Sequence, residues 1–232
     1  MTQTQAKPRR ICRGIAGVTD ATDHDRPRRL RRRAGKRALS AQAGRDGPCC
    51  PRHAEKPYRY EGPAMIQVGD ALPDAQLFEY IDDAREGCTL GPNAFSVRDQ
   101  VAGKRVVIFG LPGAFTPTCS AQHVPGYVEH AGQLRAAGID EIWCVSVNDA
   151  FVMGAWGRDL HTAGKVRMMA DGSAAFTHAL GLTQDLSARG MGIRSLRYAM
   201  VIDGGVVKTL AVEAPGKFEV SDAASVLATL TS

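Results

Sequence analysis

Short apolar runs alternate with helix-like segments in the middle of the chain, and this alternation constrains the fold more than any other feature. Each run is too brief for a helix and reads as a buried strand. Strand–helix–strand units favour parallel strands that are covered by helices. We expect strands over residues 104–111, 140–147 and 166–170, and helices over about 118–138 and 150–160.

The pattern then changes to two adjacent strands and a closing helix. Gly204 and Gly205 separate two apolar runs, a spacing typical of a tight hairpin. A hairpin after parallel strands predicts an α/β, thioredoxin-like fold, in which helices flank a central mixed β-sheet. Further elements are expected at strand 75–81, helix 173–182, strands 198–203 and 206–212, and helix 222–230.

The first 64 residues differ in composition from the remainder. They hold 16 of the 29 lysines and arginines but only 6 of the 24 acids, which gives +10, whereas residues 65–232 carry −5. Without apolar periodicity, such a segment cannot offset the entropy lost on ordering. We therefore predict a disordered, arginine-rich extension over residues 1–64, or an upstream mis-start with Met65 as the true start. Residues 65–232 form the thioredoxin-like domain.

Charge and composition also limit the partners. The arginine run could serve as a nucleic-acid-binding arm, but no nucleic acid partner is expected, because a disordered or mis-started segment is the favoured interpretation of residues 1–64. No stretch approaches the ~20 apolar residues of a membrane span, and no signal peptide is evident. We expect a cytoplasmic protein with mostly reduced cysteines and no membrane partner. No cofactor or metal is expected, since Cys49, Cys50 and His53 fall short of four ligands.

Cys119 stands in "GLPGAFTPTCSAQH", residues 110–123, without a CxxC partner. It falls in the first turn of a predicted helix, where free N–H groups and a partial positive charge stabilise a thiolate. Thr116, three residues earlier, carries a hydroxyl that both donates and accepts. A thiolate beside a hydroxyl suits attack on the O–O bond of a peroxide. The alternative is an inert core cysteine.

These residues resemble the motif of the peroxiredoxins. The matching segments are "LPGAFTPTCSAQHVPGYVE" (111–129), "DEIWCVSVNDAFVMGAW" (140–156) and "GIRSLRYAMVIDGGVVK" (192–208). Within the family, the chain is similar to the type II, or five-type, subgroup, and to its bacterial-like glutathione- and glutaredoxin-dependent members. The resemblance spans residues 65–232 and none of 1–64.

The resemblance implies a role for each matched residue. Cys119 would attack the peroxide and become a sulfenic acid, Thr116 would orient the peroxide, and Pro112 would shield the thiolate from water. Arg197 matches the active-site arginine, whose charge would stabilise the thiolate and donate to the peroxide oxygens. Without the family, Arg197 reads as a surface charge at a strand edge, and the nearby Arg194 can be mistaken for it.

Three neighbouring side chains have less defined roles. His123, one turn after Cys119, could act as a general base for the thiol, although packing or capping within the helix is the favoured interpretation. Phe115 and Tyr127 are expected to shape a hydrophobic pocket and a subunit contact. The subgroup implies a homodimer that pairs near the active site.

The sulfenic acid must return to the thiol, and two routes are open. Cys144 matches a cysteine proposed as the resolving partner in plant relatives, but its place in mid-strand suits a buried inert thiol. A disulfide with Cys119 needs local unwinding unless the Cα atoms lie within ~7 Å. Otherwise glutathione attacks, followed by glutaredoxin, or thioredoxin serves as reductant. Cys88 is expected in a loop, as a spectator or a second thiol.

The resemblance thus predicts a thiol-specific peroxidase. It would reduce hydrogen peroxide and alkyl hydroperoxides to water and alcohols, in antioxidant defence and cell redox homeostasis. A redox sensor without turnover, or a chaperone on the same fold, is the alternative, because a fold alone does not fix activity.

Overall fold

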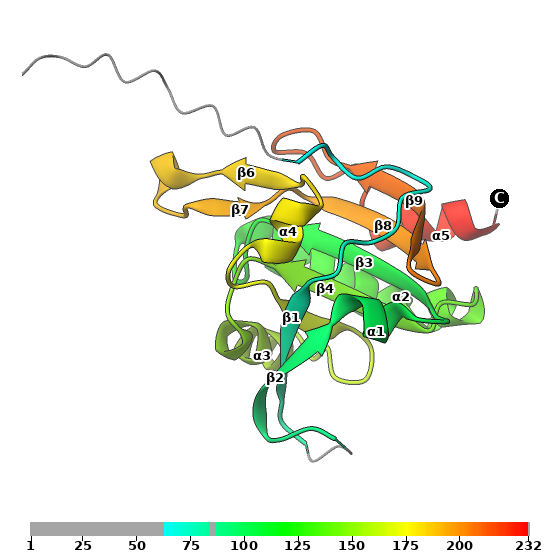
Figure 1. Cartoon of the computed structure of the whole chain (residues 1–232), viewed down its shortest axis with the longest axis horizontal. Helices are drawn as coiled ribbons and strands as arrows, with labels where there is room; N and C mark the ends of the chain where they lie inside the picture. Colours follow the sequence, from blue (N-terminus) through cyan, green and yellow to red (C-terminus); the bar gives the residue numbers. More distant parts are fainter. Residues whose placement is uncertain (1–62, 84–86, 232) are drawn as a thin grey trace, which may run out of the picture. The chain divides into compact units, whose positions relative to one another are not determined.

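A computed structural model of the protein describes residues 63–83 and 87–231. It shows a seven-stranded sheet in the order β2-β1-β5-β4-β3-β8-β9 and a separate two-stranded sheet, β6-β7 (Figure 1). The expected thioredoxin-like arrangement, a mixed sheet flanked by helices, is confirmed. The extension predicted over residues 1–64 lies outside the described residues apart from its last two, so its disorder stays a prediction.

The elements agree with the sequence prediction in the central part of the chain. The strands are β1 (Gln76–Ile81), β2 (Gly91–Ser96), β3 (Arg105–Leu111), β4 (Glu141–Ser146), β5 (Arg167–Ala170), β6 (Thr183–Asp185), β7 (Ile193–Ser195), β8 (Tyr198–Asp203) and β9 (Val206–Val212). The helices are α1 (Val97–Val101), α2 (Val124–Ala136), α3 (Ala150–Asp159), α4 (Ala175–Ala179) and α5 (Ala223–Thr231), with a π-helical turn η1 (Cys119–His123) and a 3₁₀ turn η2 (Ser187–Arg189).

The sheet has a parallel centre and antiparallel edges. β3 and β4 are parallel, as are β4 and β5, whereas β8 runs antiparallel to β3 and forms the predicted hairpin with β9. On the other side, β1 is antiparallel to both β5 and β2. The carboxyl ends of β3 and β4 therefore lie at the same edge, beside the start of β8.

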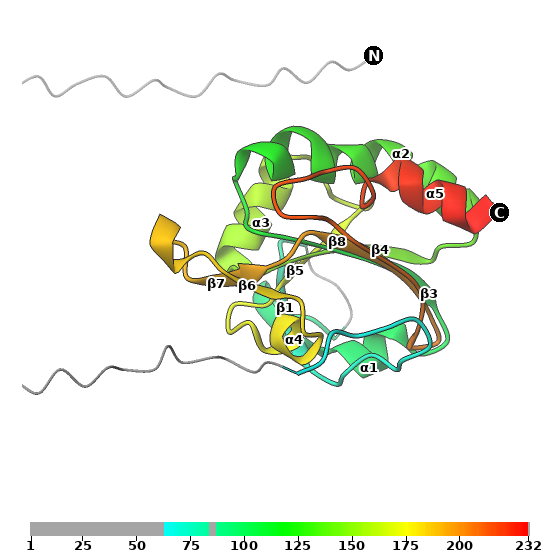
Figure 2. The same cartoon turned by 90° about the horizontal axis from the view of Figure 1, so that it is seen from above.

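Both faces of the sheet are covered. Figure 2 shows α2, α3 and α5 on one face and α1 and α4 on the other. Alternate residues of β3 enter the two hydrophobic clusters, Val107 and Phe109 on one side and Val106 and Ile108 on the other. A strand that is apolar on both faces is what a central strand between helices requires.

β2 and α1 were not predicted. β2 reads Gly-Pro-Asn-Ala-Phe-Ser, which is poor in strand-forming residues, and it is ordered because all six residues pair with β1 at the edge of the sheet. α1 follows at once, since the Ser96 hydroxyl accepts a hydrogen bond from the Asp99 N–H and caps the helix. Within the described ranges, no helix combines the length and the apolar character needed to cross a membrane.

Candidate active site

Cys119 lies on an irregular helical turn that follows the carboxyl end of β3. The Ser120 N–H donates to the Thr116 carbonyl at 2.9 Å, four residues back, but the Val124 N–H donates to the Cys119 carbonyl, five residues back. This shift from α- to π-type bonding comes just before Pro125, which has no N–H to donate. The irregularity before Pro125 thus takes the form of η1, with Cys119 at its first position.

Arg197 is the charged group that the structure brings to Cys119. Its Nη2 donates to the Cys119 Sγ at 3.5 Å, although the two residues are 78 positions apart. The Cys119 side chain is fully buried and Arg197 is half-buried. A guanidinium in this place can donate to an oxygen beside the sulfur and stabilise negative charge that develops there. The interpretation of Arg197 as a surface charge is therefore wrong, because it ignored the partner that the fold supplies.

Arg194 has a different task, although it is only three residues away. Its Nη1 donates to the Val147 carbonyl at 3.0 Å and its Nε to the Met191 carbonyl at 2.8 Å. A Cβ on Gly113 would lie only 3.3 Å from the Arg194 Nη1, so the glycine gives the guanidinium room. Arg194 thus holds the loops around β4 and β7 in place and is not the arginine that contacts Cys119.

The loop between β3 and η1 carries Pro112 and Thr116, both half-buried. The Thr116 hydroxyl donates to the Gly113 carbonyl at 2.9 Å, so its oxygen lone pairs remain to accept a hydrogen bond from a substrate O–H. The Ala114 N–H donates to the Asn148 side-chain oxygen at 3.0 Å and fastens the loop to the end of β4. The roles of Pro112 as a shield and Thr116 as an orienting group stay predictions.

Tyr127 is part of the chain's own core. Its ring stacks on Phe109, with centroids 3.9 Å apart, and its hydroxyl donates to the Ser221 carbonyl at 2.9 Å. A fully buried side chain cannot form the expected subunit contact, so that prediction is wrong for Tyr127. Phe115 differs because 56% of it is exposed, at a backbone φ of 59° that non-glycine residues rarely adopt.

His123 is buried and both ring nitrogens have partners. Nε2 lies 3.0 Å from the Ser221 carbonyl and Nδ1 lies 2.9 Å from Arg197 Nη1. Burial and then the charge of Arg197 lower the pKa of His123 from 6.5 to about 3. The packing interpretation is confirmed, and a general base is excluded because neither nitrogen faces the thiol with a free lone pair.

Cys144 lies in the middle of β4, opposite Phe109 of β3, and is fully buried. Burial raises the pKa of the Cys144 thiol well above its ordinary value, and the nearby Cys119 adds to the shift. A thiol held neutral is a weak nucleophile. Cys88 is half-buried, and all three described cysteines are free. A resolving role for Cys144 stays a prediction that requires local opening of the strand.

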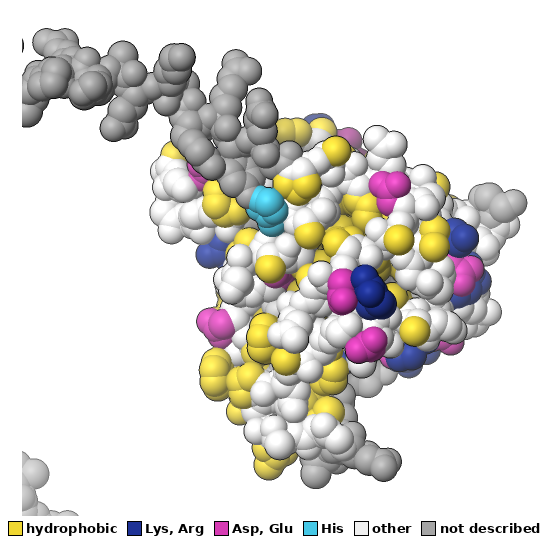
Figure 3. All heavy atoms as spheres, in the orientation of Figure 1, with side chains coloured by type: hydrophobic (Ala, Val, Ile, Leu, Met, Phe, Trp, Pro, Cys, Tyr) yellow, Lys and Arg dark blue, Asp and Glu magenta, His cyan; other side chains and the backbone are white. Residues whose placement is uncertain are grey.

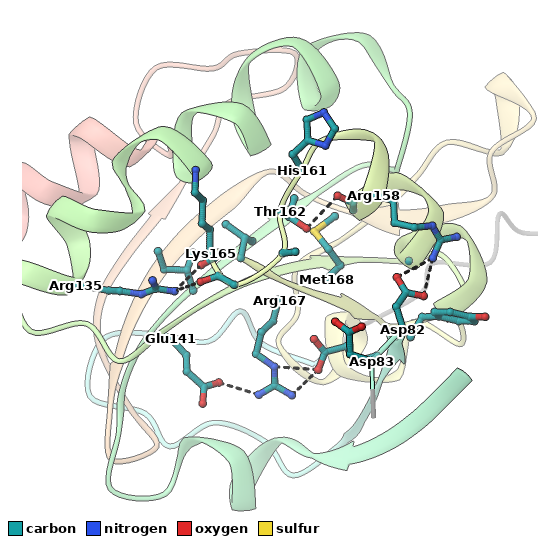
Figure 4. A pocket seen from close by; sticks show the side chains of 18 of the residues that line it. Asp82, Asp83, Arg135, Glu141, Arg158, His161, Thr162, Lys165, Arg167 and Met168 are labelled. Carbon is teal, nitrogen blue, oxygen red and sulfur yellow. Dashed lines mark hydrogen bonds and ion pairs between the residues drawn. The ribbon is translucent and has the colours of Figure 1, made fainter. Parts of the chain in front are cut away.

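A large cavity lies at the other end of the sheet, at the amino ends of β4 and β5 (Figure 4). It measures about 620 Å³, and several of the charged side chains that line it form ion pairs with one another. Arg167 pairs with Glu79 and Glu141, each at 2.8 Å, and Arg158 pairs with Asp82 at 2.9 Å. Its lining contains no cysteine. The described residues also hold no cluster of histidine, cysteine or acidic side chains suited to a metal.

One apolar region is exposed near the β1–β2 end of the sheet. Figure 3 shows hydrophobic side chains gathered there, while charges of both signs are scattered elsewhere on that face. Phe78 is 41% exposed and Leu90 69%. Phe78, Pro92 and Phe151 line a hollow of about 350 Å³. Contiguous exposed apolar surface is typical of a protein contact.

Comparison with known proteins decides the family. The Redoxin family matches residues 67–227. Peroxiredoxin-2B of Arabidopsis thaliana is 46% identical over 167 residues, which cover 72% of this chain and 99% of that protein. The chain belongs to the peroxiredoxin family. Membership gives this peroxiredoxin a thiol peroxidase activity of antioxidant function, with a peroxide as substrate and a thiol as reductant.

Solved structures agree with the assignment. Reduced Prx3 from Vibrio vulnificus, in complex with H₂O₂, is 52% identical, has a TM-score of 0.66, and the match covers 72% of this peroxiredoxin and 99% of that chain. A crystal structure from Burkholderia cenocepacia is 98% identical, with a TM-score of 0.72 and coverage of 72% and 99%. That structure carries only the provisional name of a thioredoxin reductase, which differs from the Redoxin match and from Peroxiredoxin-2B.

Sequence reasoning missed two residues behind the site, Ser221 and Glu213. Ser221 acts through its carbonyl, which every residue has, and Glu213 holds the loop that carries it. Neither residue could have been identified from its type or its spacing in the sequence.

Proposed function

We propose that this peroxiredoxin reduces hydrogen peroxide and small alkyl hydroperoxides at Cys119. The observation that carries the proposal is the 3.5 Å contact between Arg197 Nη2 and the Cys119 Sγ. This contact places Cys119, the proposed nucleophile, beside a cation that also donates hydrogen bonds. The Thr116 hydroxyl lies on the loop that leads to Cys119. The Vibrio relative in complex with H₂O₂ supports the choice of substrate.

The chemistry requires one bond to form and one to break. The Cys119 thiolate attacks the nearer oxygen of ROOH, the S–O bond forms, and the O–O bond breaks. Sulfur is oxidised to the sulfenic acid, and the leaving oxygen takes from solvent a proton equivalent to the one that the thiol released, and departs as ROH. Arg197 stabilises the negative charge that develops on that oxygen. Thr116 accepts from the peroxide O–H and aims it, while Pro112 covers the sulfur.

An external thiol then restores Cys119. Glutathione attacks the sulfenic acid, releases water and leaves a mixed disulfide, which glutaredoxin or a second glutathione reduces. The burial and raised pKa of Cys144 favour this route over an internal disulfide. Thioredoxin is the other reductant to be tested. No bound cofactor takes part in the cycle.

The assembly and the location are part of the same proposal. We infer a homodimer, supported by the exposed apolar region around Phe78 and Phe151. The cytoplasmic location is an expectation from the sequence, and some relatives are chloroplastic, such as Peroxiredoxin-2E of Arabidopsis thaliana.

Peroxide consumption tests the proposal. Wild type and Cys119→Ser are compared with glutathione plus glutaredoxin, and separately with thioredoxin and its reductase, as electron donors. Wild type should turn over with at least one donor and Cys119→Ser with neither. Unchanged turnover in Cys119→Ser would sink the mechanism. A wild type that is oxidised once but never turns over would indicate the sensor alternative instead.

A further inference from the structure

Arg197 divides its guanidinium between two partners. Nη2 donates to the Cys119 Sγ at 3.5 Å and Nη1 donates to His123 Nδ1 at 2.9 Å. A guanidinium only donates, so Nδ1 must be the accepting nitrogen. Nε2 then carries the proton and donates it to the Ser221 carbonyl at 3.0 Å. These contacts define one neutral tautomer of His123.

The surroundings of His123 keep it in that state. The charged groups that act on it are Arg197, Glu213 and Asp222, and burial is the largest influence on its lowered pKa. Its ring packs against Phe109 and Phe218, with centroids 4.9 Å away in each case. A protonated ring would lose the acceptor at Nδ1 and place two cations side by side.

A carboxylate fixes the loop that supplies the Ser221 carbonyl. One oxygen of Glu213 accepts hydrogen bonds from the Glu219, Val220 and Ser221 amides and from the Ser221 hydroxyl, all at 2.8 Å. The same loop lays the Phe218 ring against the Arg197 guanidinium, 5.5 Å from ring centre to Cζ. The loop therefore supports His123 and Arg197 together.

We propose that His123 is a positioning residue: its Nδ1 holds Arg197 so that Nη2 reaches the Cys119 sulfur. It exchanges no proton with the thiol, and it acts only through Arg197. The inference rests on the proposed function for what Arg197 does at the sulfur. It goes further because it assigns a role in that reaction to His123, which is not among the four proposed site residues Pro112, Thr116, Cys119 and Arg197.

Two substitutions of His123 separate the roles of its two ring nitrogens. In His123→Asn the side-chain oxygen is as many bonds from the backbone as Nδ1, so it can accept from Arg197 while the contact with Ser221 is lost. In His123→Gln the amide reaches the position of Nε2 and can donate to Ser221, but Arg197 loses its acceptor. Each variant thus keeps one hydrogen bond of the pair.

The rate of Cys119 oxidation by hydrogen peroxide, followed by stopped flow, is the main readout. His123→Gln should be slower than wild type by about 10- to 100-fold, the value of one hydrogen bond to a charged group. His123→Asn should stay within about threefold, because the acceptor is kept. Melting temperatures are measured alongside. If His123 had only a structural role, the oxidation rate of each variant would follow its melting temperature and would not depend on whether an acceptor for Arg197 is kept.

Alkylation of Cys119 by iodoacetamide at pH 7, read by mass spectrometry of its peptide, gives a second measure that needs no peroxide. It should slow in His123→Gln and not in His123→Asn. Wild type that alkylates rapidly but consumes no peroxide would defeat the proposed function alone. Equal rates in the two variants, or a larger loss in His123→Asn, would overturn the positioning role.

Glu213→Gln keeps the test decisive if both histidine variants fail to fold. It weakens the loop that holds both the Ser221 carbonyl behind His123 and the Phe218 ring on Arg197. Both supports of Arg197 loosen in this variant while the His123 ring stays in place, so oxidation of Cys119 should slow several-fold. An oxidation rate equal to that of wild type would overturn the proposal.

Discussion

Cys119 and Cys144 are both fully buried on the same side of the sheet, yet their surroundings differ. Cys144 sits within a regular strand, where burial raises its pKa. Cys119 sits on a π-helical turn, where Arg197 reaches its sulfur. The comparison teaches that burial alone makes a thiol inert. A cation brought from elsewhere in the chain is what distinguishes the surroundings of Cys119, the proposed nucleophile.

The sheet register explains how that cation arrives. Tyr198, the first residue of β8, pairs with Gly110 near the carboxyl end of β3, so the preceding Arg197 falls beside the loop that leads to Cys119. The Tyr198 ring occupies the space over Gly110, where a Cβ would lie 2.1 Å from a ring carbon. A glycine in β3 thus allows the close approach that sets the position of β8.

Loss of Arg197 should make the Cys119 thiol as unreactive toward peroxide as we expect the Cys144 thiol to be. Arg197→Met keeps much of the apolar stem and removes the charge and donors, so oxidation by peroxide should slow by about 10²- to 10³-fold. Arg197→Lys is the matched control: it keeps the charge without the fork, and we expect an intermediate rate. Stopped-flow oxidation measures both. If the oxidation rate of Arg197→Met fell by less than about threefold, Arg197 would not be what distinguishes Cys119 from Cys144.

Substitution of Thr116 tests whether its hydroxyl also contributes to the reactivity of Cys119. Thr116→Val removes the hydroxyl at similar size, and we expect oxidation to slow by about 10-fold, the value of one hydrogen bond. Thr116→Ser keeps the hydroxyl and should stay close to wild type. Equal rates in the valine and serine variants would show that the hydroxyl is not used.

Acid should weaken the support behind Arg197 before it affects the core around Cys144. Burial raises the pKa of Glu213, but hydrogen bonds from the Val220, Glu219 and Ser221 amides outweigh it and leave the pKa below its ordinary value of 4.5. Its stabilising contribution is therefore fully present above 4.5 and is lost as the pH falls through the lowered value. Hydrogen exchange of the Ser221 amide should increase in that range.

Glu213→Gln is the control for this pH effect. The amide cannot titrate, so exchange at Ser221 should be faster at neutral pH and should lose its acid dependence. An acid dependence that survives in Glu213→Gln would assign the effect to another group, such as Asp222.

Cys144→Ala should have the smallest effect on the reaction. With glutathione as donor, we expect the rate of turnover to match wild type, because the buried thiol takes no part. The free energy of unfolding in urea should fall by about 1–2 kcal/mol, since a small cavity replaces the sulfur. A large loss of turnover with unchanged oxidation of Cys119 would show that Cys144 resolves the sulfenic acid after all.

Elements with strong local signals were predictable. β3, β4 and the β8–β9 hairpin have apolar runs bounded by turn residues, and Asp149 caps α3 by accepting a hydrogen bond from the Val152 N–H. α4 is shorter than the helix predicted over 173–182, because Ala174 adopts a left-handed conformation and the Asp171 carboxylate accepts from the amides that follow. β2, β6 and β7 were missed because pairing, not local sequence, orders them.

The site was predictable only in part, for the same reason. Thr116 and Cys119 lie in one short motif, and their spacing on a loop and a helix could be read directly. The contact of Arg197 with Cys119 depends on sheet register, and the sequence indicated it only through resemblance. The links from Arg197 to His123 and onward to Ser221 join residues 74 and 98 positions apart, one of them through a backbone carbonyl. Residue spacing carries no signal of such contacts.

Trapping of the sulfenic acid tests most directly the claim that Arg197 makes Cys119 the reactive thiol. Wild type and Arg197→Met receive one equivalent of hydrogen peroxide in the presence of dimedone, and peptides are analysed by mass spectrometry. We predict a rapid adduct on the Cys119 peptide of wild type, a much slower one in Arg197→Met, and none on the Cys144 peptide. Labelling of Cys144 at a similar rate, or equal labelling of Cys119 in both proteins, would contradict the account.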